Sequence, residues 1–185
     1  MSRTSLSPLL SLALAVVALS SGAAMPAPEL PPGIAAQLPQ VKVQGGGELT
    51  FLGLSIYAAH LYRPGNARGE WSPDEPFALQ LVYHRSLKGP LVAARSMEEM
   101  EKQGSCTAEQ RVRWGETLAK ILPDVDAGDQ LTGVNLPKRG VQFYQNGKLI
   151  GSIDDSAFAR AFFGIWLAPA SSEPALRQQL LGITP

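Results

Sequence analysis

Cysteine and histidine are scarce in this sequence. Cys106 is the only cysteine, so no disulfide forms within the chain and its stability must come from packing. His60 and His84 are the only histidines, and no cluster of cysteines or carboxylates accompanies them, which argues against a zinc site. Because one axial histidine suffices for haem, the sequence leaves haem open and otherwise predicts no cofactor.

An excess of charge of either sign is also missing, since Lys plus Arg and Asp plus Glu number 16 each. The basic residues are scattered and form no run that is interleaved with aromatic side chains. Proteins that bind the phosphate backbone of a nucleic acid carry such a basic patch. The composition therefore argues against a nucleic acid partner.

Long apolar stretches are absent beyond the first residues, because charged residues or prolines interrupt each candidate. The N-terminus has Arg3, an apolar run over residues 9–19 and small residues at 20–24, which is the layout of a secretory signal peptide. The run is shorter than the ~20 residues that a membrane span needs. We predict a signal peptide over residues 1–24, cleaved after Ala24, and a periplasmic or secreted protein without a membrane span. An uncleaved anchor is the alternative.

The rest of the chain fits one domain. Residues 25–37 are rich in proline and predict an extended lead-in, and residues 38–185 are long enough for one core. Alternating side chains predict one strand over residues 49–61, covered on both faces, and another over residues 77–85.

Helical spacing follows over residues 91–103. The Glu98, Glu99 and Glu101 cluster on this helix is typical of a solvated face. A second helix is expected from Thr107, with Gln110 completing a capping box, until a proline ends it at position 123.

The C-terminal part predicts strands at about residues 130–136 and 140–144. An Asn-Gly pair at 146–147 predicts a tight turn that pairs residues 141–144 with 149–153. Asp154 or Asp155 is expected to cap a helix that runs through Trp166, and residues 173–181 form the last helix. Because strands and helices come in separate blocks, the predicted class is α+β, with an antiparallel sheet packed by helices.

Several segments resemble the chalcone isomerase family, in order and at matching spacing, and the C-terminal ones resemble its bacterial chalcone isomerase-like branch. The segments are residues 51–57 (FLGLSIY), 83–85 (YHR) with 89–90 (GP), 140–144 (GVQFY) with 146–151 (NGKLIG), 161–167 (AFFGIWL) and 176–182. The resemblance implies an open-faced β-sandwich. In this fold a large antiparallel sheet carries a layer of helices, and the ligand cleft lies between them.

The resemblance also implies where catalytic residues would stand. The plant enzymes use an Arg, a Thr, a Tyr, an Asn and a late hydroxyl residue. Here Gln40 stands at the position of the Arg and Leu52 at that of the Thr. Residues 107–115, where the Tyr and Asn would lie, contain neither, and Gly164 or Ile165 stands at the position of the late hydroxyl residue. One missing donor costs about 3 to 4 kcal/mol of transition-state stabilisation. We therefore expect no chalcone isomerase catalysis, and whether the chain is an enzyme of another kind stays open.

Polar side chains near the implied cleft are the candidate ligand contacts. Tyr83 and Arg85 share a predicted strand face with apolar residues, an arrangement that suits an apolar ligand with an anionic end. Tyr57 adds a hydroxyl, and Leu52 and Gln40 occupy the positions that the resemblance places beside the cleft. The alternative is that the tyrosines are core residues and Arg85 lies at the rim.

Three functions remain open at this level. The leading hypothesis is an exported, non-catalytic protein that binds a small amphiphilic ligand, such as a fatty or aromatic acid, in the cleft between sheet and helices. The second is an isomerase, an intramolecular lyase, that acts on a chalcone-like or other enone substrate through Tyr57, Tyr83 and Arg85. The third is a structural or interaction protein of the cell envelope.

Overall fold

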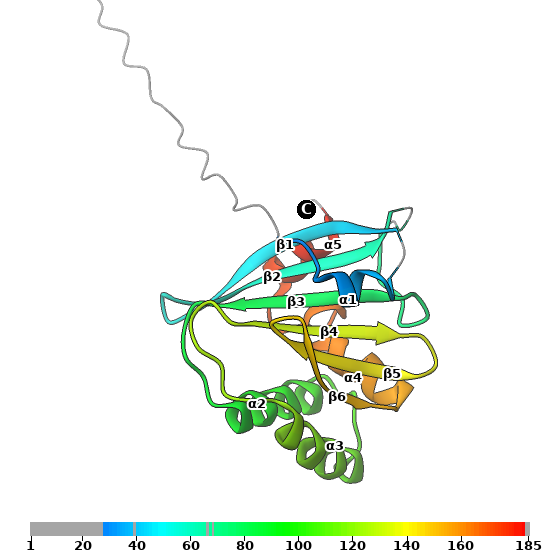
Figure 1. The fold of residues 1–185 in the computed structure, drawn as a ribbon. Coiled ribbons are helices and arrows are strands. Elements are labelled where there is room, and N and C mark those ends of the chain that lie inside the picture. Colours follow the sequence, from blue (N-terminus) through cyan, green and yellow to red (C-terminus); the bar gives the residue numbers. More distant parts are fainter. Residues whose placement is uncertain (1–27, 39, 66, 68, 184–185) are drawn as a thin grey trace, which may run out of the picture.

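A computed structural model describes residues 28–38, 40–65, 67 and 69–183. The predicted signal peptide and its cleavage point lie outside these residues. Six strands form one antiparallel sheet in which each strand pairs with its neighbours along the chain (Figure 1). The strands are β1 (Val41–Phe51), β2 (Leu54–Pro64), β3 (Phe77–Tyr83), β4 (Gln130–Leu136), β5 (Gly140–Gln145) and β6 (Lys148–Ile153).

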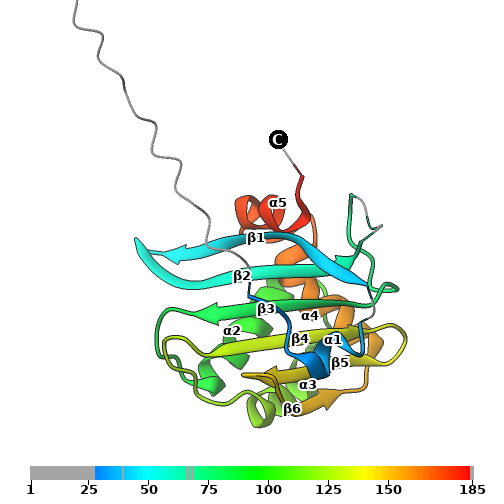
Figure 2. The same ribbon diagram turned by 45° about the horizontal axis from the view of Figure 1, so that its top comes forward.

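The helices lie on both sides of this sheet. They are α1 (Pro32–Ala35), α2 (Gly89–Lys102), α3 (Ala108–Ile121), α4 (Ser156–Leu167) and α5 (Pro174–Leu181). Figure 2 shows α1 in front of the sheet and the layer formed by α2, α3 and α4 behind it. This confirms the predicted α+β class, with a large antiparallel sheet packed by helices. Within the described part of the chain, no helix is long and apolar enough to cross a membrane.

The main core lies between the sheet and the helix layer. Phe143 of β5 packs against Phe158 and Phe162 of α4, and edge-to-face ring contacts extend to Trp114 of α3 and Trp166. Such pairs stabilise beyond the area that they bury. The apolar character of α4 on nearly all sides is therefore explained by burial under its neighbours.

Asp155 fixes the start of α4. Its carboxylate accepts hydrogen bonds from the backbone N–H of Ala157 at 2.9 Å and of Phe158 at 3.2 Å. It also accepts from Trp114 Nε1 at 3.0 Å, which ties α3 to α4. The predicted cap is confirmed at Asp155. The capping box at Thr107 and the hairpin turn between β5 and β6 are confirmed as well.

The single strand predicted over residues 49–61 is wrong. β1 ends at Phe51, and a two-residue turn with positive φ at Leu52 (49°) and Gly53 (75°) leads into β2. Leucine is not a turn residue, so apolar alternation continued through the turn and concealed it. The strand predicted to reach Arg85 also ends earlier, at Tyr83, and the lead-in contains α1.

Two glycines of β1 allow α5 to lie directly on the sheet. A Cβ atom on Gly45 would come 2.0 Å from the backbone oxygen of Gln179, and one on Gly47 would meet the Gln179 and Leu176 side chains. Gln44 Nε2 donates to the backbone oxygen of Leu181 at 3.0 Å. The C-terminal helix thus covers the first strand.

Candidate ligand-binding cleft

A cavity of about 280 Å³ lies between the sheet and the helices α2 and α4. Large apolar side chains from the central strands and α4 form most of its wall, among them Leu81, Leu131, Phe143, Phe162 and Ile165. Pockets for small organic ligands are concave, mostly apolar and carry a few placed polar groups. The cavity has this character.

A β-bulge in β2 shapes one wall. The pairing of β1 with β2 passes from Leu49 opposite Tyr57 to Thr50 opposite Ser55, which leaves Ile56 without a partner. A bulge re-aims side chains that would otherwise alternate between the two faces. Ile56 and Tyr57 both line the cavity although they are adjacent in sequence.

Two tyrosines contribute polar groups to the wall. Tyr57 and Tyr83 are paired across β2 and β3, with ring centroids 5.8 Å apart. Trp166 Nε1 donates to the Tyr57 hydroxyl oxygen at 2.9 Å. Among the described residues, no acceptor receives the hydroxyl proton of Tyr57 or that of Tyr83. Burial raises the pKa of both far above the ordinary tyrosine value, so both hydroxyls remain protonated donors.

A network of charged groups lies at the rim of the cavity. The Glu99 carboxylate forms an ion pair with Arg95 at 2.6 Å and accepts hydrogen bonds from Lys102 at 3.0 Å and from the Ser172 hydroxyl. Ser172 precedes α5, so these contacts link α2 to the segment between α4 and α5. Glu99 is only 6% exposed, and the prediction that it belongs to a solvated face is wrong.

The charge of Glu99 is stabilised by its partners. Burial raises the pKa of its carboxyl group, but the hydrogen bonds from Ser172 and Lys102 and the charge of Arg95 outweigh burial. The net pKa therefore lies below the ordinary value of a glutamate. Glu99 is an anion at neutral pH and leaves Arg95 partly neutralised.

The structure brings together only some of the candidate site residues. Tyr57 and Tyr83 line the cavity, whereas Arg85, Leu52 and Gln40 are not part of its wall. Arg85 is exposed and lies beyond the end of β3. The strand alternation that predicted it on the same face as Tyr83 therefore does not extend to residue 85. Leu52 lies in the β1–β2 turn, and Gln40 precedes the opposite end of β1.

Sequence reasoning did not name most of the residues that line the cavity, among them Arg95, Ile56 and Trp166. The i, i+3 and i, i+4 spacing of Arg95 to Glu98 and Glu99 predicts ion pairs along the helix, which the structure contains, but it does not indicate a cavity beside them. Ile56 carries no sequence signal, because a bulge without glycine looks like regular alternation.

The histidines and the cysteine lie outside the cavity wall. His60 is half-buried, and burial lowers its pKa. His84 is exposed and lies 3.5 Å from Glu48. Burial raises the pKa of the Cys106 thiol, which disfavours the reactive thiolate.

Comparison with known proteins identifies the fold and the family. The model of a family described as chalcone isomerase-like matches residues 29–182. The chain belongs to the chalcone isomerase-like family. An uncharacterized protein of Haemophilus influenzae is 30% identical over 141 residues, which cover 76% of this chain and 67% of that protein.

A solved structure shares the fold of this chalcone isomerase-like chain. It is the crystal structure of a fatty-acid binding protein of Arabidopsis thaliana, with a TM-score of 0.61 and 11% identity. The match covers 77% of this chain and 87% of the plant protein. At this identity the likeness establishes the common fold, and the chemistry of the cavity must be argued from its own residues.

Proposed function

We propose that this protein binds a small amphiphilic acid, fatty or aromatic, in the cavity between the sheet and the helices α2 and α4, without isomerase catalysis. One observation carries the proposal: an apolar cavity contains two tyrosine hydroxyls whose protons have no acceptor among the described residues. Buried polar groups are normally hydrogen-bonded, so donors of this kind suit an acceptor that arrives with a ligand. The fatty-acid binding relative of the same fold supports this reading.

The expected pose follows from the wall. The carboxylate accepts hydrogen bonds from the hydroxyls of Tyr57 and Tyr83, while Arg95 at the rim is paired with Glu99. The hydrocarbon part lies against the apolar side chains of β3, β4 and α4, where each buried methylene contributes about 0.8 kcal/mol. Affinity then comes mainly from the apolar part, and the orientation of the ligand comes from the tyrosines.

The same groups are poorly suited to isomerase chemistry. Ring closure of a chalcone requires that the substrate's phenol lose its proton to a base and be held as a phenolate. Tyr57 and Tyr83 have strongly raised pKa values, so at neutral pH neither accepts a proton nor carries charge. A turnover assay with chalcones and other enone phenols checks this alternative, since measurable ring closure would contradict the non-catalytic proposal.

A structural role in the cell envelope predicts a cleft filled by the protein's own side chains. The cavity of about 280 Å³ favours a ligand instead. We further propose that binding takes place after export, in the periplasm or outside the cell. N-terminal sequencing of the purified protein checks this, with a start near Met25 as the expected result and a retained Met1 as the contrary one.

The decisive experiment replaces Tyr83 by phenylalanine. Because the Tyr83 hydroxyl donates to no described residue, Tyr83→Phe should leave the free energy of unfolding nearly unchanged. Affinity for dodecanoic acid, measured by calorimetry, should fall about tenfold, since a hydrogen bond to a charged group contributes about 1.5 to 3 kcal/mol.

Tyr144→Phe is the matched control, because its hydroxyl lies on the other face of the sheet, 2.8 Å from Gln142 Oε1. It should bind dodecanoic acid as the parent does. Native mass spectrometry of protein from its own host identifies the natural ligand. If neither dodecanoic nor aromatic acids bind the parent and no ligand co-purifies, the proposed function is wrong.

A further inference from the structure

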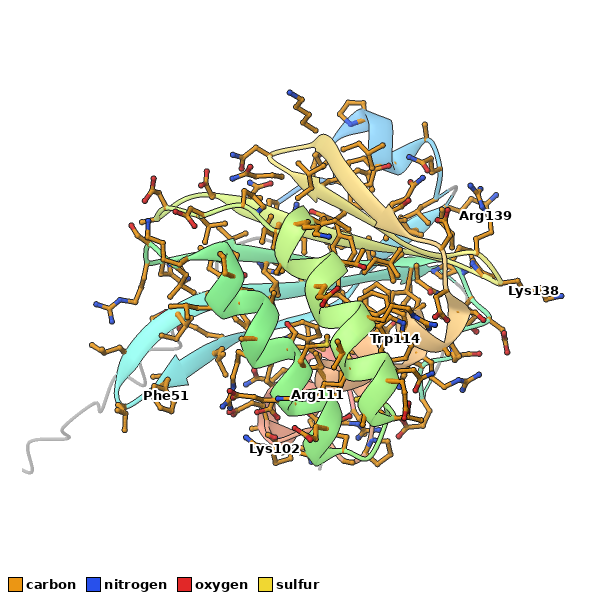
Figure 3. All side chains as sticks on the ribbon, turned by 90° about the horizontal axis from the view of Figure 1, so that it is seen from below. Phe51, Lys102, Arg111, Trp114, Lys138 and Arg139 are labelled. Carbon is orange, nitrogen blue, oxygen red and sulfur yellow. The ribbon has the colours of Figure 1, made fainter. Side chains whose placement is uncertain are left out.

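The β1–β2 hairpin ends in exposed apolar side chains. Phe51 is 62% exposed, Leu52 85% and Leu54 50%. Figure 3 shows Phe51 at the end of this hairpin, which projects beyond the body of the domain. We call Phe51, Leu52 and Leu54 the hairpin tip. Large apolar residues gathered at one exposed point mark interaction sites more often than isolated ones do.

The backbone conformation at the hairpin tip is one in which leucine is rarely found. Leu52 has a φ of 49°, in the left-handed region where asparagine, aspartate or glycine are favoured. A leucine there costs conformational energy, and its side chain is the most exposed large apolar one in the described part of the chain. Stability of the hairpin does not explain this residue, whereas a contact made by the exposed side chain does.

The hairpin tip stands next to the rim of the cavity. Leu49 and Ile56, each two residues along its strand from the hairpin tip, line the cavity. Leu91 of α2 lines it too and is 68% exposed, so apolar surface continues from the hairpin to α2. Ligands that enter or leave on this side pass near the hairpin tip.

A cationic side chain lies on the chain segment that runs beside the hairpin just behind its tip. The backbone N–H of His84 donates to the backbone oxygen of Ile56 at 2.9 Å, which holds residues 84 and 85 beside β2. Arg85 is exposed and forms no hydrogen bond or ion pair with the described residues. An exposed cation behind an apolar tip matches the order of phosphate groups and hydrocarbon at a lipid surface.

We propose that the hairpin tip inserts into the surface of a lipid membrane, with Arg85 at the level of the phosphate groups, and brings the cavity rim against the lipid. A stable protein interface uses about 20–30 residues on each side. The hairpin tip offers three, which is too few. A membrane needs no shape complementarity and accepts an apolar group that enters by ~5–10 Å. The purpose of this docking, the exchange of an amphiphilic ligand, rests on the function proposed above.

The first test measures insertion at the hairpin tip itself. An environment-sensitive fluorophore is attached to Leu52→Cys in a Cys106→Ser background, in the full chain. Vesicles of phosphatidylcholine with phosphatidylglycerol carry brominated acyl chains, which quench only fluorophores that reach the hydrocarbon. We expect strong quenching at position 52 and none for the same fluorophore at Leu149→Cys, on the opposite edge of the sheet.

Matched substitutions then test which side chains drive insertion. Leu54→Thr and Leu149→Thr change the same residue type in a strand, at exposures of 50% and 51%. In the fluorophore-labelled protein, Leu54→Thr should raise the lipid concentration for half-maximal quenching about tenfold, as expected for the loss of one inserted leucine. Leu149→Thr should change this lipid concentration less than about twofold, which is the size of effect that surface substitutions ordinarily have.

Three results would overturn the docking proposal. They are an unquenched fluorophore at position 52, equal effects of Leu54→Thr and Leu149→Thr, and a dimer or protein complex that Leu54→Thr dissolves while lipid has no effect. Dodecanoic acid affinity, measured without vesicles, is the separate readout of the cavity. Unchanged affinity without insertion refutes docking alone, and insertion without any acid binding refutes the proposed function alone.

Discussion

The tyrosines on the two faces of the sheet differ in whether their hydroxyl protons are hydrogen-bonded. Tyr57 and Tyr62 are five residues apart on β2, and both are buried. Tyr57 faces the helix layer, and its hydroxyl proton has no acceptor among the described residues. Tyr62 faces α1, and its hydroxyl donates to the backbone oxygen of Pro28 and lies 3.1 Å from Gln80 Oε1.

The surroundings explain this difference. On the α1 face, Ile34 and Leu38 pack against the small Ala78, and Gln80 is fully buried with its amide donating to Gln130 Oε1 at 3.1 Å. That face is filled and its polar groups are paired. On the helix-layer face, α2 stands away from the sheet and leaves the cavity. Unpaired donors beside empty space separate a binding face from a face that only stabilises the fold.

The largest effect is expected from filling the cavity, which makes the helix-layer face as filled as the α1 face. Ser96 of α2 is buried and lines the cavity, and among the described residues its hydroxyl donates only to the backbone oxygen of Val92. Ser96→Phe places a ring where the ligand's hydrocarbon would lie, so affinity for dodecanoic acid should fall at least about a hundredfold, measured by calorimetry. Ala94→Phe, at an exposed position of α2, is the control and should leave affinity unchanged.

A smaller effect is expected on the filled face. Tyr62→Phe removes the hydroxyl that donates to the backbone oxygen of Pro28 and lies beside the buried Gln80 oxygen, which should lower the free energy of unfolding by about 1 to 2 kcal/mol in chemical denaturation. Acid affinity should stay at the parent value, because Tyr62 lies on the other side of the sheet. A loss of affinity would show that the two faces are coupled. Burial raises the pKa of Tyr62 to about 12, so the hydroxyl stays protonated in this measurement.

The smallest expected effect concerns the rim. The pKa of Glu99 is lowered in the folded protein, so its stabilising contribution is complete above the unfolded value of about 4.3 and is lost as pH falls through the folded pKa. Glu99→Gln should cost about 1 kcal/mol of unfolding free energy at neutral pH. The cost should vanish in acid, as denaturation at several pH values will show. An equal cost at every pH would mean that the charge of Glu99 does not stabilise the fold.

Local signals in the sequence predicted much of the fold. Asn146-Gly147, Thr107 and Asp155 each have a conformational or capping role that depends on few neighbours, and each prediction is confirmed. The Leu52-Gly53 turn was missed, because leucine is seldom found at the positive φ that Leu52 adopts. An exposed leucine in a turn has the same appearance in sequence as a leucine in a buried strand.

The candidate site was harder to predict than the fold. Tyr57 and Tyr83 line the cavity as proposed from their strands, but the cation at the rim is Arg95 of α2. Its position depends on how far α2 stands from the sheet, which no local pattern encodes. Glu99 looked solvated for a related reason, since its partner Ser172 is 73 residues away in the chain.

The order of the strands has a consequence for the kinetics of folding. Because every strand pairs with its neighbours along the chain, most strand pairs close short loops at modest entropic cost, and only β3 and β4 have helices, α2 and α3, between them. The contact between α5 and β1 is different, since Gln44 and Leu181 are 137 residues apart. We expect this contact to form late. The docking of the C-terminal helix onto the glycines of the first strand would then limit the rate at which the native domain forms.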